Sequence, residues 1–237
     1  MHAAEWGRHR ESATIQHEHI TQLGWYAGGV LLGFVVPFLF TSVFDLNHDL
    51  YYGIYFAAVG VFLGAYVRWT GLDVAELFRR NWKWSLVLGA IAAVLLVFNV
   101  YRREDATPRP DGAYFLFSLG WRGVLYGTVD ALLLSAFPVA VAYALVSGRL
   151  DGIARKASFG ALALGLTLVI TATYHLGYEQ YRDDGIGGPE TGNAIISLPA
   201  ILTANPLGSV IAHASMHVAA DAHAYETDVF LPPKTES

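Results

Sequence analysis

The chain has 237 residues, a formal net charge of −5 and no cysteine. Charged residues make up 15% and hydrophobic residues 54%, against about 25% charged residues in an average soluble domain. This composition argues against a soluble enzyme, a disordered chain and a nucleic-acid-binding protein. The lack of cysteine excludes disulfides, thiolate metal sites and a cysteine nucleophile. We therefore expect an integral membrane protein.

The first half of the chain predicts a polar tail followed by three membrane-spanning helices. Residues 1–22 are polar and carry no signal-peptide pattern. Residues 23–111 hold three runs of roughly the 20 apolar residues that a membrane crossing needs. These runs are Leu23–Phe44, Leu50–Val67 and Trp84–Tyr101.

The second half, residues 112–221, predicts a transmembrane core followed by a polar tail over 222–237. Its apolar blocks are Ala113–Ser147, Ala157–Leu176 and Asn193–Ala220. The first block is too long for one crossing and short for two, so we divide it near Gly127–Asp130. The last block is divided at Asn205, which precedes a proline. The predicted fold is an all-α, polytopic transmembrane helix bundle of about six to eight helices.

Basic residues predict the orientation of the bundle. Lys and Arg gather in cytoplasmic loops, and they are frequent after the second span and in the loop that follows Ser147. The loop at 45–49 has no Lys or Arg. We expect a cytoplasmic N-terminus, although the basic residues of 102–111 conflict with strict alternation.

Ionisable side chains inside the apolar blocks are the candidate functional residues, because such groups are costly in lipid and face the bundle interior. Arg122 and Asp130 lie eight residues apart and share a helical face. His175 ends an apolar block, and Glu179 follows four residues later. The alternative is a purely structural role, in which Arg122 and Asp130 pair with each other, bind backbone carbonyls or lie at the membrane edge.

His213, His217 and Asp221 form a stripe with a spacing of four residues on the last block. Two histidines one helical turn apart suit a divalent metal such as zinc, because each neutral ring offers one nitrogen. Asp221, His175 or Glu179 would supply a third ligand. The alternative is a histidine-rich helix edge that makes interhelical hydrogen bonds.

Three segments resemble the CPBP (Abi, CAAX-processing-like) intramembrane proteases. Trp121-Arg-Gly-Val-Leu-Tyr-Gly127 looks like the region of the first motif, EExxxR. Tyr174-His175-Leu176 resembles the second motif, and the helix from Asn205 to His217 resembles the last motif, HxxxN or HxxxD. The resemblance covers about residues 113–221 and implies a helical core that contains the site.

The same resemblance implies glutamic peptidase chemistry with catalytic roles for Arg122, His175 and His213. Phe117 and Ser118 stand where the two glutamates belong, and His217 stands where Asn or Asp is usual. A general base must accept a proton, and neither the Phe117 nor the Ser118 side chain can do this in place of a carboxylate. We therefore expect a divergent member without that peptidase activity, or one in which Glu179 or Asp130 serves instead.

Two other functions fit the same residues. One is a membrane metalloprotein that binds its ion through His175, His213, His217 and Asp221. The other is a small transporter or structural membrane protein with an internal polar network. In each case the expected partners are the lipid bilayer and a membrane protein or peptide substrate, with no nucleic acid, and the expected location is a bacterial plasma membrane.

Overall fold

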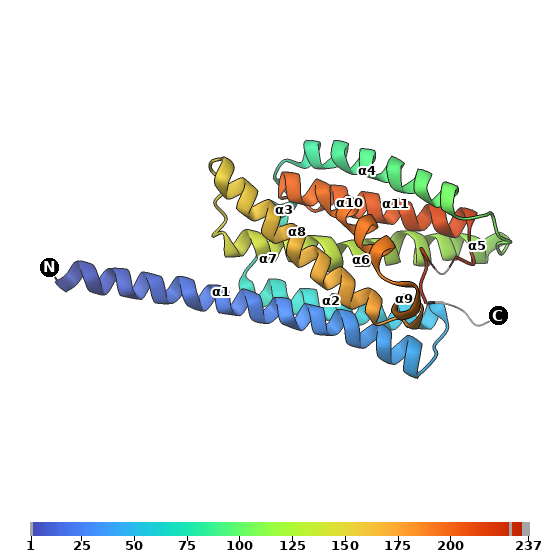
Figure 1. Cartoon of the computed structure of the whole chain (residues 1–237), viewed down its shortest axis with the longest axis horizontal. Helices are drawn as coiled ribbons and strands as arrows, with labels where there is room; N and C mark the ends of the chain where they lie inside the picture. The colour runs from blue at the N-terminus through green and yellow to red at the C-terminus, as the bar shows by residue number, and fades with distance from the viewer. Residues whose placement is uncertain (1, 228, 234–237) are drawn as a thin grey trace.

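The computed structural model describes residues 2–227 and 229–233, with the side chains of 2–17 and 184 left out. Within these residues the chain is all-α, which confirms the predicted fold class (Figure 1). Five helices are long and apolar enough to cross a membrane. They are Glu18–Val43, His48–Thr70 (α2), Trp82–Arg103 (α4), Gly112–Leu145 and Ile153–Leu176 (α8).

The first helix is longer than the sequence predicts. Helix α1 runs over His2–Pro37 and continues as a π-helical segment, Phe38–Val43. Residues 2–22, which we expected to form a solvated tail, therefore extend the first span as helix, and α1 projects beyond the rest of the bundle (Figure 1).

The fourth span is one unbroken helix at the centre of the bundle, so the predicted division near Gly127–Asp130 is wrong. It joins α5 (Gly112–Ser118), α6 (Tyr126–Ala131) and α7 (Phe137–Leu145) through two π-helical segments, Leu119–Leu125 and Leu132–Ala136. Of its most apolar window, 72% is buried, against 28–33% in the other four spans. Neighbouring helices therefore enclose this helix, and lipid thickness does not limit its length.

The last apolar block is two helices, as predicted. Helix α10 covers Gly187–Thr203 and α11 covers Leu207–His223. Between them, the Asn205 side chain accepts a hydrogen bond from the Leu207 amide at 2.8 Å and donates one to the Phe78 carbonyl at 2.8 Å. Asn205 thus accepts a hydrogen bond from the first amide of α11 and ties the break to the end of the short helix α3 (Val74–Arg79).

Helices α10 and α11 run between the two ends of the bundle. At one end the Asn81 side chain donates to the Thr203 carbonyl at 2.9 Å. At the other end the Thr107 amide donates to the His223 carbonyl at 3.1 Å. At 17 residues each, the two helices are about 25 Å long. The chain therefore passes from end to end seven times, and the short helix α9 (Glu179–Asp184) lies at the same end as Thr107.

Helix α11 lies close against α4 because two glycines meet where they cross. A Cβ atom at Gly89 would overlap the backbone of Gly208, and a Cβ at Gly208 would overlap the carbonyl of Ser85. Small residues allow this close approach of backbones in membrane bundles. The contact carries α11 into the interior, where its histidines meet the fourth span.

Candidate metal centre

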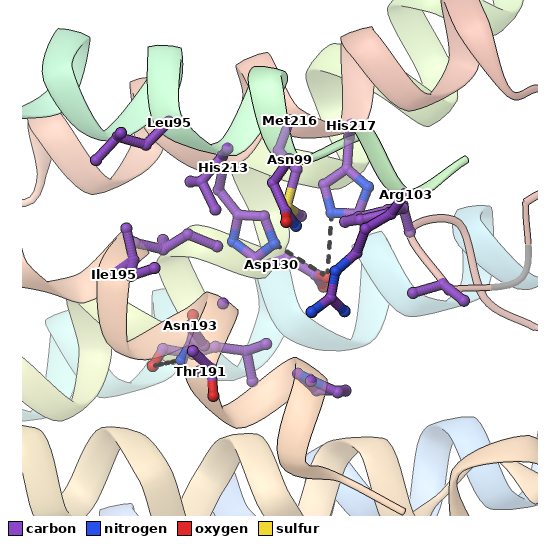
Figure 2. A pocket seen from close by; sticks show the side chains of 18 of the residues that line it. Leu95, Asn99, Arg103, Asp130, Thr191, Asn193, Ile195, His213, Met216 and His217 are labelled. Carbon is purple, nitrogen blue, oxygen red and sulfur yellow. Dashed lines mark hydrogen bonds and ion pairs between the residues drawn. The ribbon is translucent and has the colours of Figure 1, made fainter. Parts of the chain in front are cut away.

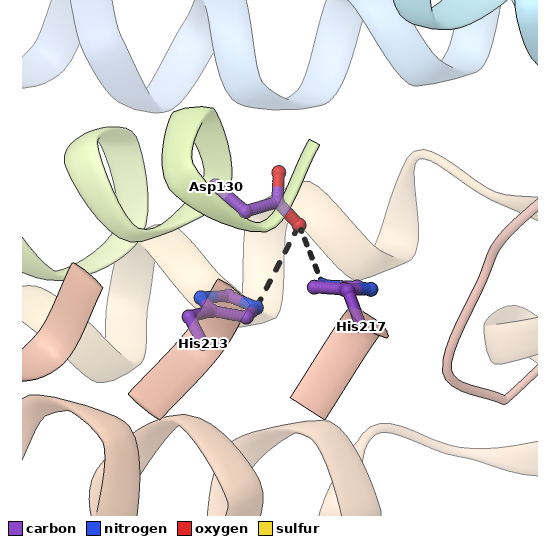
Figure 3. Close-up of side chains that lie close together, drawn as sticks. All are labelled: Asp130, His213 and His217. Atoms are coloured by element: carbon purple, nitrogen blue, oxygen red, sulfur yellow. Dashed lines mark ion pairs between the residues drawn. The ribbon is translucent and has the colours of Figure 1, made fainter. Parts of the chain in front are cut away.

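Asp130, His213 and His217 form a compact buried group in the middle of the bundle. The Oδ2 atom of Asp130 lies 3.9 Å from Nε2 of His213 and 3.8 Å from Nε2 of His217 (Figure 3). One ligand atom from each residue lies within 4.8 Å of the other two. All three side chains are buried, so three potential metal ligands converge on one point.

The two histidines project from α11 toward the same point because they are one helical turn apart. Their rings stack, with centroids 4.8 Å apart and an interplanar angle of 18°. Asp130 comes from α6, on the facing helix (Figure 3). The ligand atoms therefore belong to two helices that are far apart in the sequence.

Two glycines of the fourth span bring these helices together. A Cβ at Gly127 would lie 2.7 Å from the Cα of Ala214, and one at Gly123 would lie 2.8 Å from a side-chain carbon of Val218. Gly123 and Gly127 are one turn apart and lie on one face, so they form a groove that receives α11. Asp130 follows Gly127 by three residues and so points at the adjacent His213.

Tyrosine hydroxyls hold the second oxygen of Asp130. Tyr55 donates to Oδ1 at 2.6 Å and Tyr174 donates to the same atom at 3.1 Å. These bonds orient the carboxylate so that Oδ2 faces the histidines.

The tyrosine contacts extend away from the carboxylate as a buried hydroxyl network. Tyr174 bonds to Tyr178 and Tyr126 at 2.7 Å each, and Tyr178 bonds to Tyr51 at 2.6 Å. All these rings are fully buried, so a buried chain of hydroxyls runs from Asp130 to Tyr51.

Three imidazole nitrogens of the group lack a well-aligned hydrogen bond. Within the described residues these buried atoms are Nδ1 of His213 and both ring nitrogens of His217, and the Phe230 backbone lies close to the His217 ring. Buried polar atoms are nearly always paired, and an orphan often marks an ion or water that binds there. The 3.8 and 3.9 Å separations are too long for direct hydrogen bonds. The geometry therefore leaves room for an atom between the three ligands.

The group lines a cavity of about 300 Å³ (Figure 2). His175 lines the same cavity, and its Nδ1 lies 2.8 Å from the Thr171 carbonyl. A carbonyl oxygen only accepts hydrogen bonds, so Nδ1 carries the proton and Nε2 keeps its lone pair. His175 thus adds a hydrogen-bond acceptor beside the three-residue group, outside the ligand triangle itself.

The other sequence-predicted site residues lie elsewhere. Arg122 donates to Asp49 at 2.8 Å and to Tyr114 at 3.2 Å, and it does not line the cavity. Asp221 accepts a hydrogen bond from Ser118 at 2.7 Å and is not part of the ligand triangle. Glu179 begins α9 and does not line the cavity. The structure therefore brings together His175, His213 and His217, but separates them from Arg122, Asp221 and Glu179.

The partnership of Asp130 with His213 and His217 was not found by sequence reasoning, which set Asp130 beside Arg122 on one helix. The tyrosines were missed as well. Their spacing carried a signal, because Tyr51 and Tyr55 are one turn apart, as are Tyr174 and Tyr178. Three of these tyrosines lie inside apolar spans and Tyr178 just beyond one, and buried tyrosine hydroxyls need hydrogen-bond partners.

Comparisons with known proteins give no relative for this chain. No family model, no curated protein and no solved structure matches it.

Proposed function

We propose that this chain is a membrane-embedded metalloprotein that binds a divalent transition-metal ion, with zinc as the best fit, through Asp130, His213 and His217. The observation that carries the proposal is the convergence of one carboxylate oxygen and two imidazole nitrogens with Oδ2–Nε2 distances of 3.8 and 3.9 Å. Two ligands that each lie about 2.0–2.1 Å from a tetrahedral zinc ion are about 3.4 Å apart. The two carboxylate–imidazole distances exceed this value by about half an ångström, and all three ligand atoms lie within 4.8 Å of one another. The side chains must therefore draw together to bind the ion.

The surroundings of the three ligands favour a resident ion. Tyr55 and Tyr174 orient the carboxylate through Oδ1, which is the kind of outer hydrogen bond that supports metal ligands. Two nitrogens and one oxygen match the donor preference of zinc, and no thiolate is required.

The reaction class that this site supports best is hydrolysis. Three protein ligands would leave a fourth position for water, as in catalytic zinc sites, and the cavity that these residues line would give that water and a substrate access. A bound ion lowers the pKa of such a water toward neutrality. In hydrolysis the water oxygen attacks a carbonyl carbon, the bond to the leaving group breaks, and the water proton moves to the leaving group. We assign the transfer of this proton to Nε2 of His175, which has a free lone pair in the cavity.

Metal analysis of the full-length protein tests the proposal. We expect about one equivalent of zinc in protein purified in a mild detergent. His213→Ala and Asp130→Asn should each retain less than about a tenth of it, because a site with two ligands binds weakly. His223→Ala is the matched control, since it lies on the same helix but binds the Glu104 carbonyl. A wild-type protein that holds no stoichiometric divalent metal after purification from zinc-supplemented cells overturns the proposal.

Kinship with the CPBP proteases stays a prediction. Asp130 supports it in one respect, because it places a carboxylate beside His213 where the family's chemistry requires glutamates. Phe117 has 47% of its surface exposed on the outside of the bundle. The position aligned with the first glutamate therefore does not line the cavity. We propose that any hydrolysis by this chain uses the carboxylate of Asp130 as a metal ligand.

We also propose that the N-terminus faces the cytoplasm. The end of the bundle that holds residues 68–83 and 146–156 carries seven Lys or Arg and three Asp or Glu, whereas the opposite end, with residues 44–49, 102–111 and 177–186, carries four Arg and eight Asp or Glu. Because Gly112–Leu145 is a single span, the segment with Arg149, Arg155 and Lys156 lies at the same end as the 71–81 loop. The three arginines of 102–111 remain at the opposite end.

A further inference from the structure

The cavity beside the metal ligands reaches the lipid-facing surface of the bundle. Its deep wall includes Asp130 and His213, and its outer wall includes Leu95 and Phe98 of α4. Leu95 and Phe98 are 56% and 64% exposed, and α4 is one of the five candidate spans. The cavity therefore opens sideways, between α4 and α10, toward the region that acyl chains occupy (Figure 2).

The walls of the cavity are apolar along α4 and α10 and polar at one end. Apolar lining side chains come from both helices and are Leu95, Leu96, Phe98, Ile195 and Ile196. Asn99, Arg102 and Arg103 line the end near the loop that follows α4. From Leu95 to Arg103 the helix rises about 12 Å, so the opening changes from apolar to cationic over that length.

Arg103 is a cation without a protein counter-ion. Its side chain lines the cavity (Figure 2), and its Nη1 atom lies 3.9 Å from a Cβ built on Gly188, at the start of α10. No ion pair or side-chain hydrogen bond joins Arg103 to any other residue that the structure describes, whereas Arg122 has Asp49. A guanidinium binds phosphate or carboxylate through paired hydrogen bonds. The exposed guanidinium of Arg103 is therefore available to an anion at the polar end of an apolar cavity.

We propose that the cavity binds an anionic single-chain lipid ester. The acyl chain lies between α4 and α10, the anionic head group pairs with Arg103, and the ester carbonyl lies near Asp130, His213 and His217. The hydrolytic step rests on the proposed metal site, but the binding of the lipid does not. In that step water adds to the carbonyl carbon, the bond to the head-group oxygen breaks, and the water proton goes to that oxygen. The products are a fatty acid and a head-group alcohol.

One glycine offers a way to close the cavity without moving the backbone. Gly192 of α10 lines the cavity, and a Cβ built on it meets no atom within 4 Å. Gly192→Trp should fill the opening. Gly165 of α8 is the matched control, because a Cβ there also meets no atom within 4 Å and Gly165 does not line the cavity.

Binding of two lipids to the detergent-purified full chain tests the proposal. The probes are palmitoyl lysophosphatidate and monopalmitoylglycerol, which share the chain and the glycerol but differ in the phosphate. We expect the phosphate-bearing lipid to bind at least about tenfold more tightly. Arg103→Gln should remove this preference, and Arg68→Gln, at the exposed end of α2, should keep it. Gly192→Trp should abolish binding of both lipids, and Gly165→Trp should not.

Equal affinity for the two lipids, or an unchanged preference in Arg103→Gln, overturns the proposal. Wild-type affinity in Gly192→Trp overturns it as well. The metal content of the wild type is measured in the same samples. A wild-type protein that holds zinc but binds neither lipid counts against the lipid proposal alone, and one that binds the phosphate-bearing lipid but holds no metal counts against the metal site alone.

Discussion

The geometry of the candidate metal site depends on Asp130, because its two carboxylate oxygens make different contacts. Oδ1 accepts hydrogen bonds from Tyr55 and Tyr174, and Oδ2 faces His213 and His217. A carboxylate held in this way presents one oxygen as a ligand with little freedom to rotate. The orientation of one side chain thus decides whether three ligand atoms meet.

Tyr55→Phe removes the shorter of the two hydrogen bonds to Asp130, at 2.6 Å. We expect zinc affinity to fall about 10- to 100-fold, because the loss of an outer hydrogen bond to a metal ligand has effects of this size. Competition with a chromophoric chelator measures the affinity.

Tyr66→Phe is the control for this change. It removes a hydroxyl from the same helix that bonds to Gln22 at 2.9 Å, outside the tyrosine network around Asp130. Equal zinc affinity in Tyr55→Phe and the wild type would show that the hydroxyl does not position the carboxylate.

At the scale of helices, the decisive feature is the groove formed by Gly123 and Gly127 in the fourth span. The sequence does not identify this groove, because a four-residue glycine spacing is frequent in membrane helices and does not show which helix packs against it. Only the packed structure shows that α11 fills this groove.

Gly127→Ala tests the groove. The added Cβ would lie 2.7 Å from the Cα of Ala214, so α11 must shift outward. We expect a loss of about 1–3 kcal/mol in stability, typical of overpacking, together with weaker zinc binding. Thermal unfolding in detergent and chelator competition measure the two effects.

Gly120→Ala is the matched control for the groove, since it is on the same long helix and its Cβ would meet no atom within 4 Å. If Gly127→Ala and Gly120→Ala are equally stable and bind zinc equally, α11 does not depend on the groove.

Sequence patterns predicted where the helices of this chain lie better than they predicted which helices pack against one another. The break at Asn205 was predicted because an Asn-Pro pair interrupts a helix in any environment. The continuous helix through Gly127–Asp130 was not predicted, since its length depends on burial by other helices. Likewise, the four-residue spacing of His213 and His217 identified two candidate ligands. Asp130 could not be identified as the third, because the sequence does not show which helix faces the two histidines.

For the whole molecule, the distribution of charge between the two ends predicts its orientation in the membrane. Glu76 lies at the end with the basic loops and Asp105 at the opposite end, and both are exposed. Because the chain has no cysteine, a single introduced cysteine reports its own side of the membrane.

We expect Asp105→Cys to react with a membrane-impermeant maleimide in intact cells, and Glu76→Cys to react only after the membrane is permeabilised. The unaltered chain is the control and should give no labelling. The opposite labelling pattern would reverse the orientation, and labelling of both variants in intact cells would contradict the arrangement of the ends.

The distance along the chain between Asp130 and the two histidines has a consequence for biogenesis. The carboxylate belongs to the fourth span and both imidazoles belong to the last helix, so a nascent chain that still lacks α11 has only one of the three ligands. At the proposed metal site, metal capture would therefore be a late event, after the terminal helix has entered the bilayer and docked. A truncated translation product would insert into the membrane yet stay unmetallated, and metal occupancy would report that assembly is complete.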